Sequence, residues 1–246
     1  MKRLFVLALV SILSASCLAQ QHPGVEEFAA RAAEEHDLDP AEITALLEDA
    51  RFKQSIVDAM TRPAEGKPWY KYRPIFITDK RIDGGVDFWR ENEPLISQAS
   101  EQFGVDPEVI VAIIGVETFY GRITGGYRVL DALTTLSFYY PDTGNDRSDF
   151  FSKELMNFLL LGSEENLPLL EVEGSYAGAM GLGQFMPSSY REYAVDLDGD
   201  GRRDLWTSLA DVIGSVANYL HRHGWQPGQP VTSRAQVAEG ANMDIV

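Results

Sequence analysis

Hydrophobic residues recur at helical spacing along most of the chain after residue 20. Two Asp-Pro pairs, at 39–40 and 106–107, each combine an N-cap residue with a proline at the first helical position and so predict helix starts. After the first pair, residues 41–52 place their apolar side chains on one face. Further helices are predicted over 86–103, 148–161 and 208–223, the last ended by Gly224. The pattern predicts a mainly α fold.

Two stretches depart from this amphipathic pattern. Residues 109–116 carry no polar side chain, so the helix that contains them is predicted to be buried on all sides. The segment from Tyr72 to Thr78 alternates in polarity, which is typical of a strand, and predicts a minor strand or an extended arm. No long period indicates a repeat architecture. We expect at most a minor β element.

The first 19 residues have the features of a secretory signal peptide. Lys2 and Arg3 precede an apolar run from Leu4 to Leu13, and small residues follow up to Ala19. The apolar run is too short to cross a bilayer. We expect cleavage after Ala19, one mature domain over residues 20–246, and a periplasmic location.

Cys17 is the only cysteine, so no disulfide can form within the chain. Cleavage before Cys17 followed by acylation would give an outer-membrane lipoprotein. The usual lipoprotein signal has Leu three residues before the cysteine, whereas Ser14 stands there. We therefore expect a soluble, monomeric exported protein, with a lipid anchor at Cys17 as the alternative.

The charge balance narrows the class of partner. The chain has 21 Lys and Arg against 37 Asp and Glu, which gives a net charge of −16. Such a charge repels nucleic acid and anionic membranes at long range, and we expect no basic cluster to offset it. We expect no nucleic-acid partner.

Glu117 follows the apolar stretch directly. Burial disfavours the charged form of a carboxyl, so the pKa of Glu117 is expected to lie above its ordinary value. A carboxyl that keeps its proton near neutral pH can act as a general acid on a departing alkoxide. Phe119 and Tyr120 offer aromatic faces that suit sugar rings. The alternative is a helix-end Glu that reaches solvent or pairs with Arg122.

The segment 174–183 contains four glycines but matches no common glycine-rich motif. It lacks the third glycine of the dinucleotide fingerprint and the Lys-Ser/Thr of a phosphate loop. Gly174-Ser175 does not match the nucleophile elbow of serine hydrolases either. The chain can turn tightly here and offer Ser175 and Gln184 as hydrogen-bond partners for a neutral, amide-bearing sugar. The alternative is a purely structural turn.

An acidic loop with the spacing of a calcium site follows. It matches the first half of an EF-hand loop, with oxygen ligands expected from Asp196, Asp198, Asp200 and the carbonyl of Arg202. The closing position holds Thr207 instead of Glu. We expect Asp211, in preference to Asp204, to close the site, and the bound Ca²⁺ to be structural. The alternative is a solvated acidic turn.

Several segments in the same order resemble one known family. They are IIGVETFYGR (113–122), LDALTTLSFYYP (130–141), the glycine-rich and acidic stretch 174–206, and SVANYLHRHGW (215–225). The chain resembles the membrane-bound lytic murein transglycosylase B family, glycoside hydrolase family 103, from about Tyr70 to Trp225. This resemblance implies a lysozyme-like catalytic domain with an EF-hand-like calcium loop, acting on the glycan strands of peptidoglycan.

The resemblance also implies a chemistry and a set of site residues. The expected reaction is cleavage of the β-1,4 bond between N-acetylmuramic acid and N-acetylglucosamine, leaving a 1,6-anhydro end. Glu117 matches the single catalytic carboxyl of the family. Sugar-contact positions match Ser175, Gln184, Tyr72 and Tyr219, and calcium positions match Asp196, Asp198, Asp200, the Arg202 carbonyl and Asp211. Family members usually have a further C-terminal segment that lines the cleft, which this sequence up to Val246 lacks.

Three other functions remain open at this stage. A lysozyme-type muramidase would need a second carboxyl, for which the sequence offers Asp131, Asp142 and Glu154 without a motif. A non-catalytic module would bind peptidoglycan without cutting it. A calcium-dependent structural protein would leave the Glu117 and Gln184 motifs unexplained.

Overall fold

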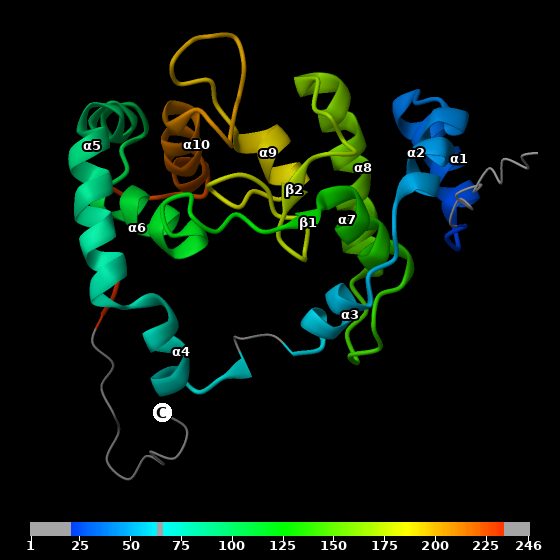
Figure 1. Ribbon diagram of the computed structural model, residues 1–246. Coiled ribbons are helices and arrows are strands. Elements are labelled where there is room, and N and C mark those ends of the chain that lie inside the picture. Colours follow the sequence, from blue (N-terminus) through cyan, green and yellow to red (C-terminus); the bar gives the residue numbers. More distant parts are fainter. Residues whose placement is uncertain (1–20, 63–65, 234–246) are drawn as a thin grey trace, which may run out of the picture.

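The computed structural model describes residues 21–62 and 66–233 (Figure 1). The predicted signal peptide and Cys17 lie outside these residues. Within them, helices surround one short two-stranded sheet. The elements are α1 (Val25–His36), α2 (Pro40–Asp49), α3 (Gln54–Met60), α4 (Trp69–Phe76), α5 (Asp79–Phe103), α6 (Pro107–Thr118), β1 (Tyr127–Arg128), α7 (Val129–Phe138), α8 (Ser148–Glu165), β2 (Glu173–Gly174), α9 (Pro187–Tyr193) and α10 (Leu209–Arg222).

Both helix starts predicted from Asp-Pro pairs are confirmed. Asp39 precedes α2, and its carboxylate accepts a hydrogen bond from the Ala41 amide at 2.8 Å. Pro107 opens α6 directly after the N-cap residue Asp106. The helices predicted over 148–161 and 208–223 are α8 and α10. The prediction of a mainly α fold is therefore confirmed.

Helix α5 is longer than predicted and is bent. It begins at Asp79, where the Thr78 hydroxyl accepts a hydrogen bond from the Arg81 amide at 3.2 Å. The helical angles break at Asn92, because Pro94 has no N–H to continue the ladder. The Asn92 side-chain amide donates to the Phe88 carbonyl at 2.8 Å and so satisfies one backbone group near the bend.

The prediction of a strand or extended arm at Tyr72 to Thr78 is wrong, because α4 occupies most of this segment. Its alternation marks no buried face: no residue of α4 is buried. A strand also needs a neighbour to satisfy its backbone, whereas here the amides of Lys71 and Tyr72 donate to the Pro68 carbonyl within the segment. Hydrogen bonds within the segment therefore make it helical despite its alternating polarity.

The minor β element lies elsewhere, between the two halves of the molecule. Strand β1 pairs antiparallel with β2, with Tyr127 opposite Gly174. Beyond β2 the chain folds back through bridges that join Met180 to Gly174 and to Phe185. This small sheet holds the glycine-rich segment beside the connection from α6 to α7 (Figure 1).

Helices pack in two groups around this sheet. Helix α5 packs against α6 and α10, while α7 packs against α8, which in turn contacts α9; α1 and α2 pair at the far side (Figure 1). In the described ranges, no helix combines the length and apolar character needed to cross a bilayer.

Tyr120 wedges between α5 and α6. Its hydroxyl donates to the Arg81 carbonyl at 3.1 Å. A Cβ atom added at either Gly85 or Gly115 would lie 2.4 Å from that hydroxyl oxygen, so only glycine leaves room for the ring at both positions. These two glycines therefore fix how α6 sits against α5.

Candidate active site

Glu117 occupies the last turn of α6, beside the glycine-rich segment. The helix ends at Thr118, and Phe119 and Tyr120 both take left-handed backbone angles. The Thr118 hydroxyl is fully buried; it donates to the Leu182 carbonyl at 2.8 Å and accepts from the Gly121 amide at 3.0 Å. This one side chain therefore fastens the end of α6 to the glycine-rich segment.

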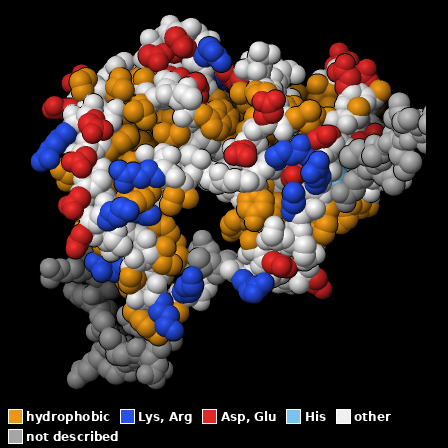
Figure 2. Space-filling model, viewed as in Figure 1, with side chains coloured by type: hydrophobic (Ala, Val, Ile, Leu, Met, Phe, Trp, Pro, Cys, Tyr) orange, Lys and Arg blue, Asp and Glu red, His pale blue; other side chains and the backbone are white. Residues whose placement is uncertain are grey.

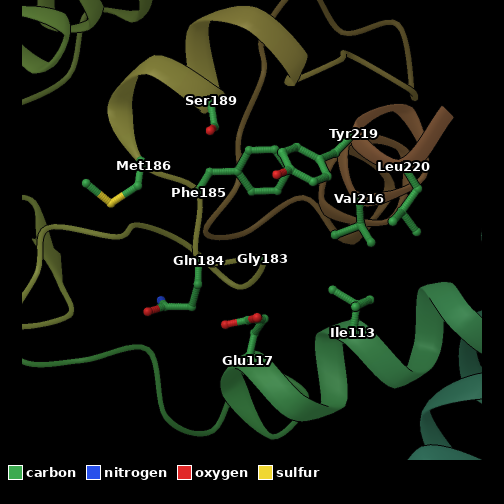
Figure 3. A pocket seen from close by; sticks show the side chains of 10 residues that line it. All are labelled: Ile113, Glu117, Gly183, Gln184, Phe185, Met186, Ser189, Val216, Tyr219 and Leu220. Atoms are coloured by element: carbon green, nitrogen blue, oxygen red, sulfur yellow. The ribbon is translucent and has the colours of Figure 1, made fainter. Parts of the chain in front are cut away.

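A cavity of about 240 Å³ opens at Glu117 (Figure 3). Helices α6 and α10, the segment 183–186 and the start of α9 contribute its walls. The lining residues are Ile113, Glu117, Gly183, Gln184, Phe185, Met186, Ser189, Val216, Tyr219 and Leu220. Most of these side chains are apolar or aromatic, and Glu117 brings the only carboxyl among them. In Figure 3 this carboxyl points from α6 toward Gly183 and Gln184.

Burial raises the pKa of Glu117 above its ordinary value. The direction agrees with the sequence prediction, although the environment differs from it. Helix α6 is not buried all round: Ile110 and Ile114 are fully buried, whereas Val116 is 41% exposed and Glu117 reaches the surface at the cavity mouth. The apolar side chains of this helix thus serve both the core and an open cavity.

The alternative in which Glu117 pairs with Arg122 is not supported. Among the described residues Glu117 forms no ion pair, and no neighbouring charge contributes to its raised pKa. The guanidinium of Arg122 instead lies 4.8 Å from the ring centroid of Phe119. The Glu117 carboxyl therefore keeps its hydrogen-bonding capacity for a ligand.

Gln184 sits in the cavity wall in a left-handed conformation, with φ of 52°. Its Nε2 donates to the carbonyls of Gly181 and Thr124, at 2.9 and 3.1 Å. These two acceptors fix the orientation of the amide. Its Oε1 forms no hydrogen bond within the described residues and can accept one from a ligand.

Tyr219, on α10, also lines the cavity. Its ring meets Phe185 edge to face, with centroids 5.9 Å apart, and stacks on His223 at 4.1 Å. Both contacts hold the Tyr219 ring in the wall of the cavity that contains Glu117, where a sugar ring could rest on an aromatic face.

Ser175 and Tyr72 do not line this cavity. The Ser175 hydroxyl accepts hydrogen bonds from the amides of Ala177 and Ala179, at 3.2 and 3.0 Å, and so stabilises the turn after β2. The Tyr72 ring lies on α4 against Phe76, with centroids 5.2 Å apart. Sugar contacts by these two residues stay predictions.

Sequence reasoning missed several wall residues. Ile113, Val216 and Leu220 look like ordinary core positions at helical spacing. Phe185, Met186 and Ser189 lie within the resembling stretch 174–206 but were given no role there. The buried anchor Thr118 was also missed, although its position next to Glu117 at a helix end was a usable signal.

The carboxyls considered for a two-carboxyl mechanism lie elsewhere. Asp131 is buried and paired with Arg128 at 2.6 Å. Glu154 is buried and accepts hydrogen bonds from the amide and hydroxyl of Ser188. Asp142 is exposed and accepts from the Gly144 amide. None of the three lines the cavity of Glu117.

Two further hollows share wall residues with this cavity. One shares Ser189 and Tyr219 with it and continues over α9 and α10. The other shares Met186 and continues past Tyr176 to Arg147, at the start of α8. The cavity of Glu117 thus has one neighbouring hollow at Ser189 and Tyr219 and another at Met186, an arrangement that suits a polymer better than a small metabolite.

The acidic loop brings three carboxyls together. Oxygen atoms of Asp196, Asp198 and Asp211 lie within 4.8 Å of one another. Asp211 is fully buried at the start of α10, and its two oxygens accept from the amides of Leu197 and Asp204, at 2.9 and 2.8 Å. Burial, together with the charges of Asp198 and Asp196, raises the pKa of Asp211. Like charges held this close suit a hard divalent cation.

Asp200 and Asp204 lie outside this group of three carboxyls. The Asp200 oxygen accepts from the Arg202 amide at 2.9 Å. Asp204 binds its own turn through the amides of Trp206 and Thr207. The geometry therefore agrees with Asp211, and not Asp204, as the closing carboxyl.

Comparison with known proteins identifies the family to which this chain belongs. Residues 20–246 match the transglycosylase SLT domain. The chain is 43% identical over 224 residues to the membrane-bound lytic murein transglycosylase B of Escherichia coli K12, covering 87% of this chain and 61% of that protein. The chain thus spans less than two thirds of the length of this relative.

Solved structures agree in fold. Soluble lytic transglycosylase SltB1 from Pseudomonas aeruginosa superposes with a TM-score of 0.79 at 53% identity, over 85% of this chain and 69% of that one. Escherichia coli lytic transglycosylase Slt35, solved in complex with calcium, gives 0.77 at 44% identity, over 86% and 66% of the two chains. The architecture is therefore the lysozyme-like one that the resemblance implied, and the chain belongs to the transglycosylase SLT domain family.

Proposed function

We propose that this protein is a lytic transglycosylase of peptidoglycan. It would cleave the β-1,4 bond between N-acetylmuramic acid and N-acetylglucosamine and form 1,6-anhydro-N-acetylmuramic acid. The observation that carries this proposal is a lone carboxyl with a raised pKa, Glu117, in an apolar and aromatic cavity. The names of the relatives, which are lytic murein transglycosylases, support the same substrate class.

In the proposed reaction, Glu117 first acts as an acid. Its proton passes to the glycosidic oxygen as the bond to the anomeric carbon breaks. The raised pKa keeps this proton available near neutral pH. The open Oε1 of Gln184 and the ring of Tyr219 would hold the sugar at Glu117.

The second step uses the sugar itself. The carboxylate of Glu117 takes the proton from the C6 hydroxyl of the muramoyl residue, and that oxygen bonds to the anomeric carbon, with assistance from the substrate's N-acetyl group. Glu117 thus regains the proton that it gave away, and no water is consumed. One carboxyl is sufficient for this sequence, in contrast with the pair that ordinary glycosidases use.

Product analysis tests the proposal directly. Purified sacculi digested with the protein should release muropeptides with anhydro ends, identified by their mass. Release of reducing ends instead would show a muramidase. Binding to sacculi without any soluble product would show a non-catalytic module. The muramidase is the weaker alternative, because no second carboxyl lines the cavity within the described residues.

We also propose that Asp196, Asp198 and Asp211 hold a structural Ca²⁺, joined by Asp200 and the carbonyl of Arg202. The clustering of three carboxyls supports it, as does the calcium complex of Slt35. The ion would neutralise the loop between α9 and α10 and so steady one wall of the cavity. None of these proposed calcium ligands lines the cavity of Glu117, which argues for a structural role of the ion.

A periplasmic location follows from the same proposal, since the glycan substrate lies outside the cytoplasmic membrane. We propose export through the segment 1–19 and a monomeric protein. Intact-mass measurement of the mature protein separates cleavage after Ala19 from acylation at Cys17.

A further inference from the structure

Cationic side chains gather around one aromatic ring where α5 meets α6. Lys80 Nζ, Arg81 Cζ and Arg122 Cζ lie 5.7, 5.0 and 4.8 Å from the ring centroid of Phe119. These three side chains are called the cation cluster below. They come from separate parts of the sequence, so no basic run announces them. The expectation that nothing offsets the acidic surface therefore fails locally.

The cation cluster adjoins the active-site helix. Arg81 Nη1 lies 3.5 Å from the carbonyl oxygen of Val116, the residue before Glu117. Arg122 follows Glu117 by five residues, so their Cα atoms are at most about 19 Å apart. The cluster is therefore within reach of a substituent on a sugar bound at Glu117.

No carboxylate in the described part of the chain lies within ion-pair distance of these charges. None of the three forms an ion pair there, whereas Arg128, Arg191 and Arg203 each pair with a carboxylate. Burial raises the pKa of Tyr120, and the positive charges of Arg81 and Arg122 partly counteract this rise. Neither guanidinium group contributes to the pKa shift of Glu117. They are thus not counter-ions of the proposed catalytic carboxyl.

The cluster is open to solvent. Lys80 and Arg122 are exposed and Arg81 is partly exposed. Figure 2 shows Lys and Arg side chains gathered on the part of the molecule that holds α4 and the start of α5, beside a hollow. In a chain with a net charge of −16, such a local concentration of positive charge selects anionic ligands by contact.

We infer that the cation cluster binds carboxylates of the peptide stems of peptidoglycan and makes the protein prefer stem-bearing glycan. This inference rests on the proposed function. Stems are attached to muramic acid and end in carboxylates, which guanidinium groups bind with paired hydrogen bonds. An extended stem advances about 3.5 Å per residue, so a few residues span the distance from Glu117 to Arg122.

The test compares two substrates with matched variants. One variant carries Lys80→Gln, Arg81→Gln and Arg122→Gln. The control removes the same number of charges at exposed positions elsewhere, with Arg51→Gln, Arg90→Gln and Lys153→Gln. Glycan release is measured on intact sacculi and on sacculi whose stems an amidase has removed. The readout is the ratio of the two rates.

The ratio is expected to fall about tenfold in the cluster variant, as for the loss of a few solvent-exposed ionic contacts. The control should keep the wild-type ratio. An unchanged ratio in the cluster variant overturns the inference, also when both rates fall together, because losing the Val116 contact would disturb both substrates alike. Loss of binding to anionic phospholipid vesicles with an unchanged ratio would likewise overturn it, in favour of a lipid surface.

A different failure identifies a wrong proposed function. If the wild-type protein releases nothing from either substrate, the lytic activity is refuted. Co-sedimentation with the two kinds of sacculi then decides on the cluster alone. Preferential binding to stem-bearing sacculi that only the cluster variant loses supports the inference, and equal binding by both variants overturns it.

Discussion

Two groups of carboxyls in this protein have opposite environments. Glu117 stands alone in an apolar cavity, with no hydrogen-bond donor from the described chain, and burial raises its pKa. Asp196 lies in an exposed loop, where hydrogen bonds from the backbone, that of the Gly201 amide first, lower its pKa. The first environment suits a carboxyl that carries a proton, and the second suits carboxylates that stay charged for a cation.

Asp211 lies between these two extremes. Its burial favours a protonated carboxyl, yet two backbone amides donate hydrogen bonds to its oxygens as they would to a carboxylate. The neighbouring Asp198 and Asp196 raise its pKa through their charge. A cation would remove this conflict, so the contrast between Glu117 and the acidic loop can be tested one residue at a time.

Replacing Glu117 should have the largest effect. The amide of Glu117→Gln has the same shape but cannot give up a proton, so the release of anhydro-muropeptides should fall at least about a thousandfold. Glu108→Gln, at the exposed first turn of the same helix, serves as the control and should keep wild-type activity. More than a tenth of the activity in Glu117→Gln would refute its role as the acid.

Removing the buried carboxyl of the acidic loop should come next. Asp211→Asn should weaken Ca²⁺ binding, measured by calorimetry, about ten- to a hundredfold, because a charged ligand becomes neutral. Asp204→Asn changes a carboxyl that binds only its own turn, and its calcium affinity should stay close to that of the wild type. The reverse order of the two variants would show that the closing ligand was misassigned.

The anchor between the helix end and the glycine-rich segment should give a moderate effect. Thr118→Val keeps the shape but leaves the Leu182 carbonyl and the Gly121 amide without their partner. The free energy of unfolding, from urea titration, should drop by about 2 kcal/mol. Thr118→Ser keeps the hydroxyl and should lose less than half of that. Equal stability of the wild type and Thr118→Val would contradict the anchoring role.

The smallest effect concerns the pH dependence of stability. Because the pKa of Glu117 is raised in the folded state, its contribution to stability is fully present below the unfolded-state pKa and is lost as the pH rises through the folded-state pKa. Glu117→Gln should therefore melt about one degree above the wild type at pH 7.5, with the difference vanishing near pH 4. A variant that melts below the wild type at pH 7.5 would show that the Glu117 charge is stabilised instead.

Features that depend on neighbouring residues could be predicted from the sequence, whereas features that depend on packing between distant segments could not. Capped helices such as α2 follow from neighbouring residues and were predicted correctly. The strand expected at Tyr72 to Thr78 was wrong, because a two-residue period has meaning only when one face packs against something, and α4 has no buried residue. The early start of α5 was missed because the pair Gly84-Gly85, inside the helix, makes room for a ring from another element.

The candidate site shows the same limit. Glu117 and Gln184 were predicted from local pattern and resemblance, and both line the same cavity. The hydrogen bond from the Thr118 hydroxyl to the Leu182 carbonyl joins their segments across 64 positions, and this partner cannot be predicted from neighbouring residues. The cation cluster was missed for a related reason, because net charge counts residues without regard to where folding brings them.

The wedge formed by Tyr120 also bears on how this protein can be altered. Because the ring of Tyr120 fills the space between α5 and α6, the position of Glu117 depends on a contact that no residue of the cavity wall makes. A methyl group at Gly85 or Gly115 would push α5 and α6 apart and displace Glu117, while every side chain that lines the cavity would stay the same.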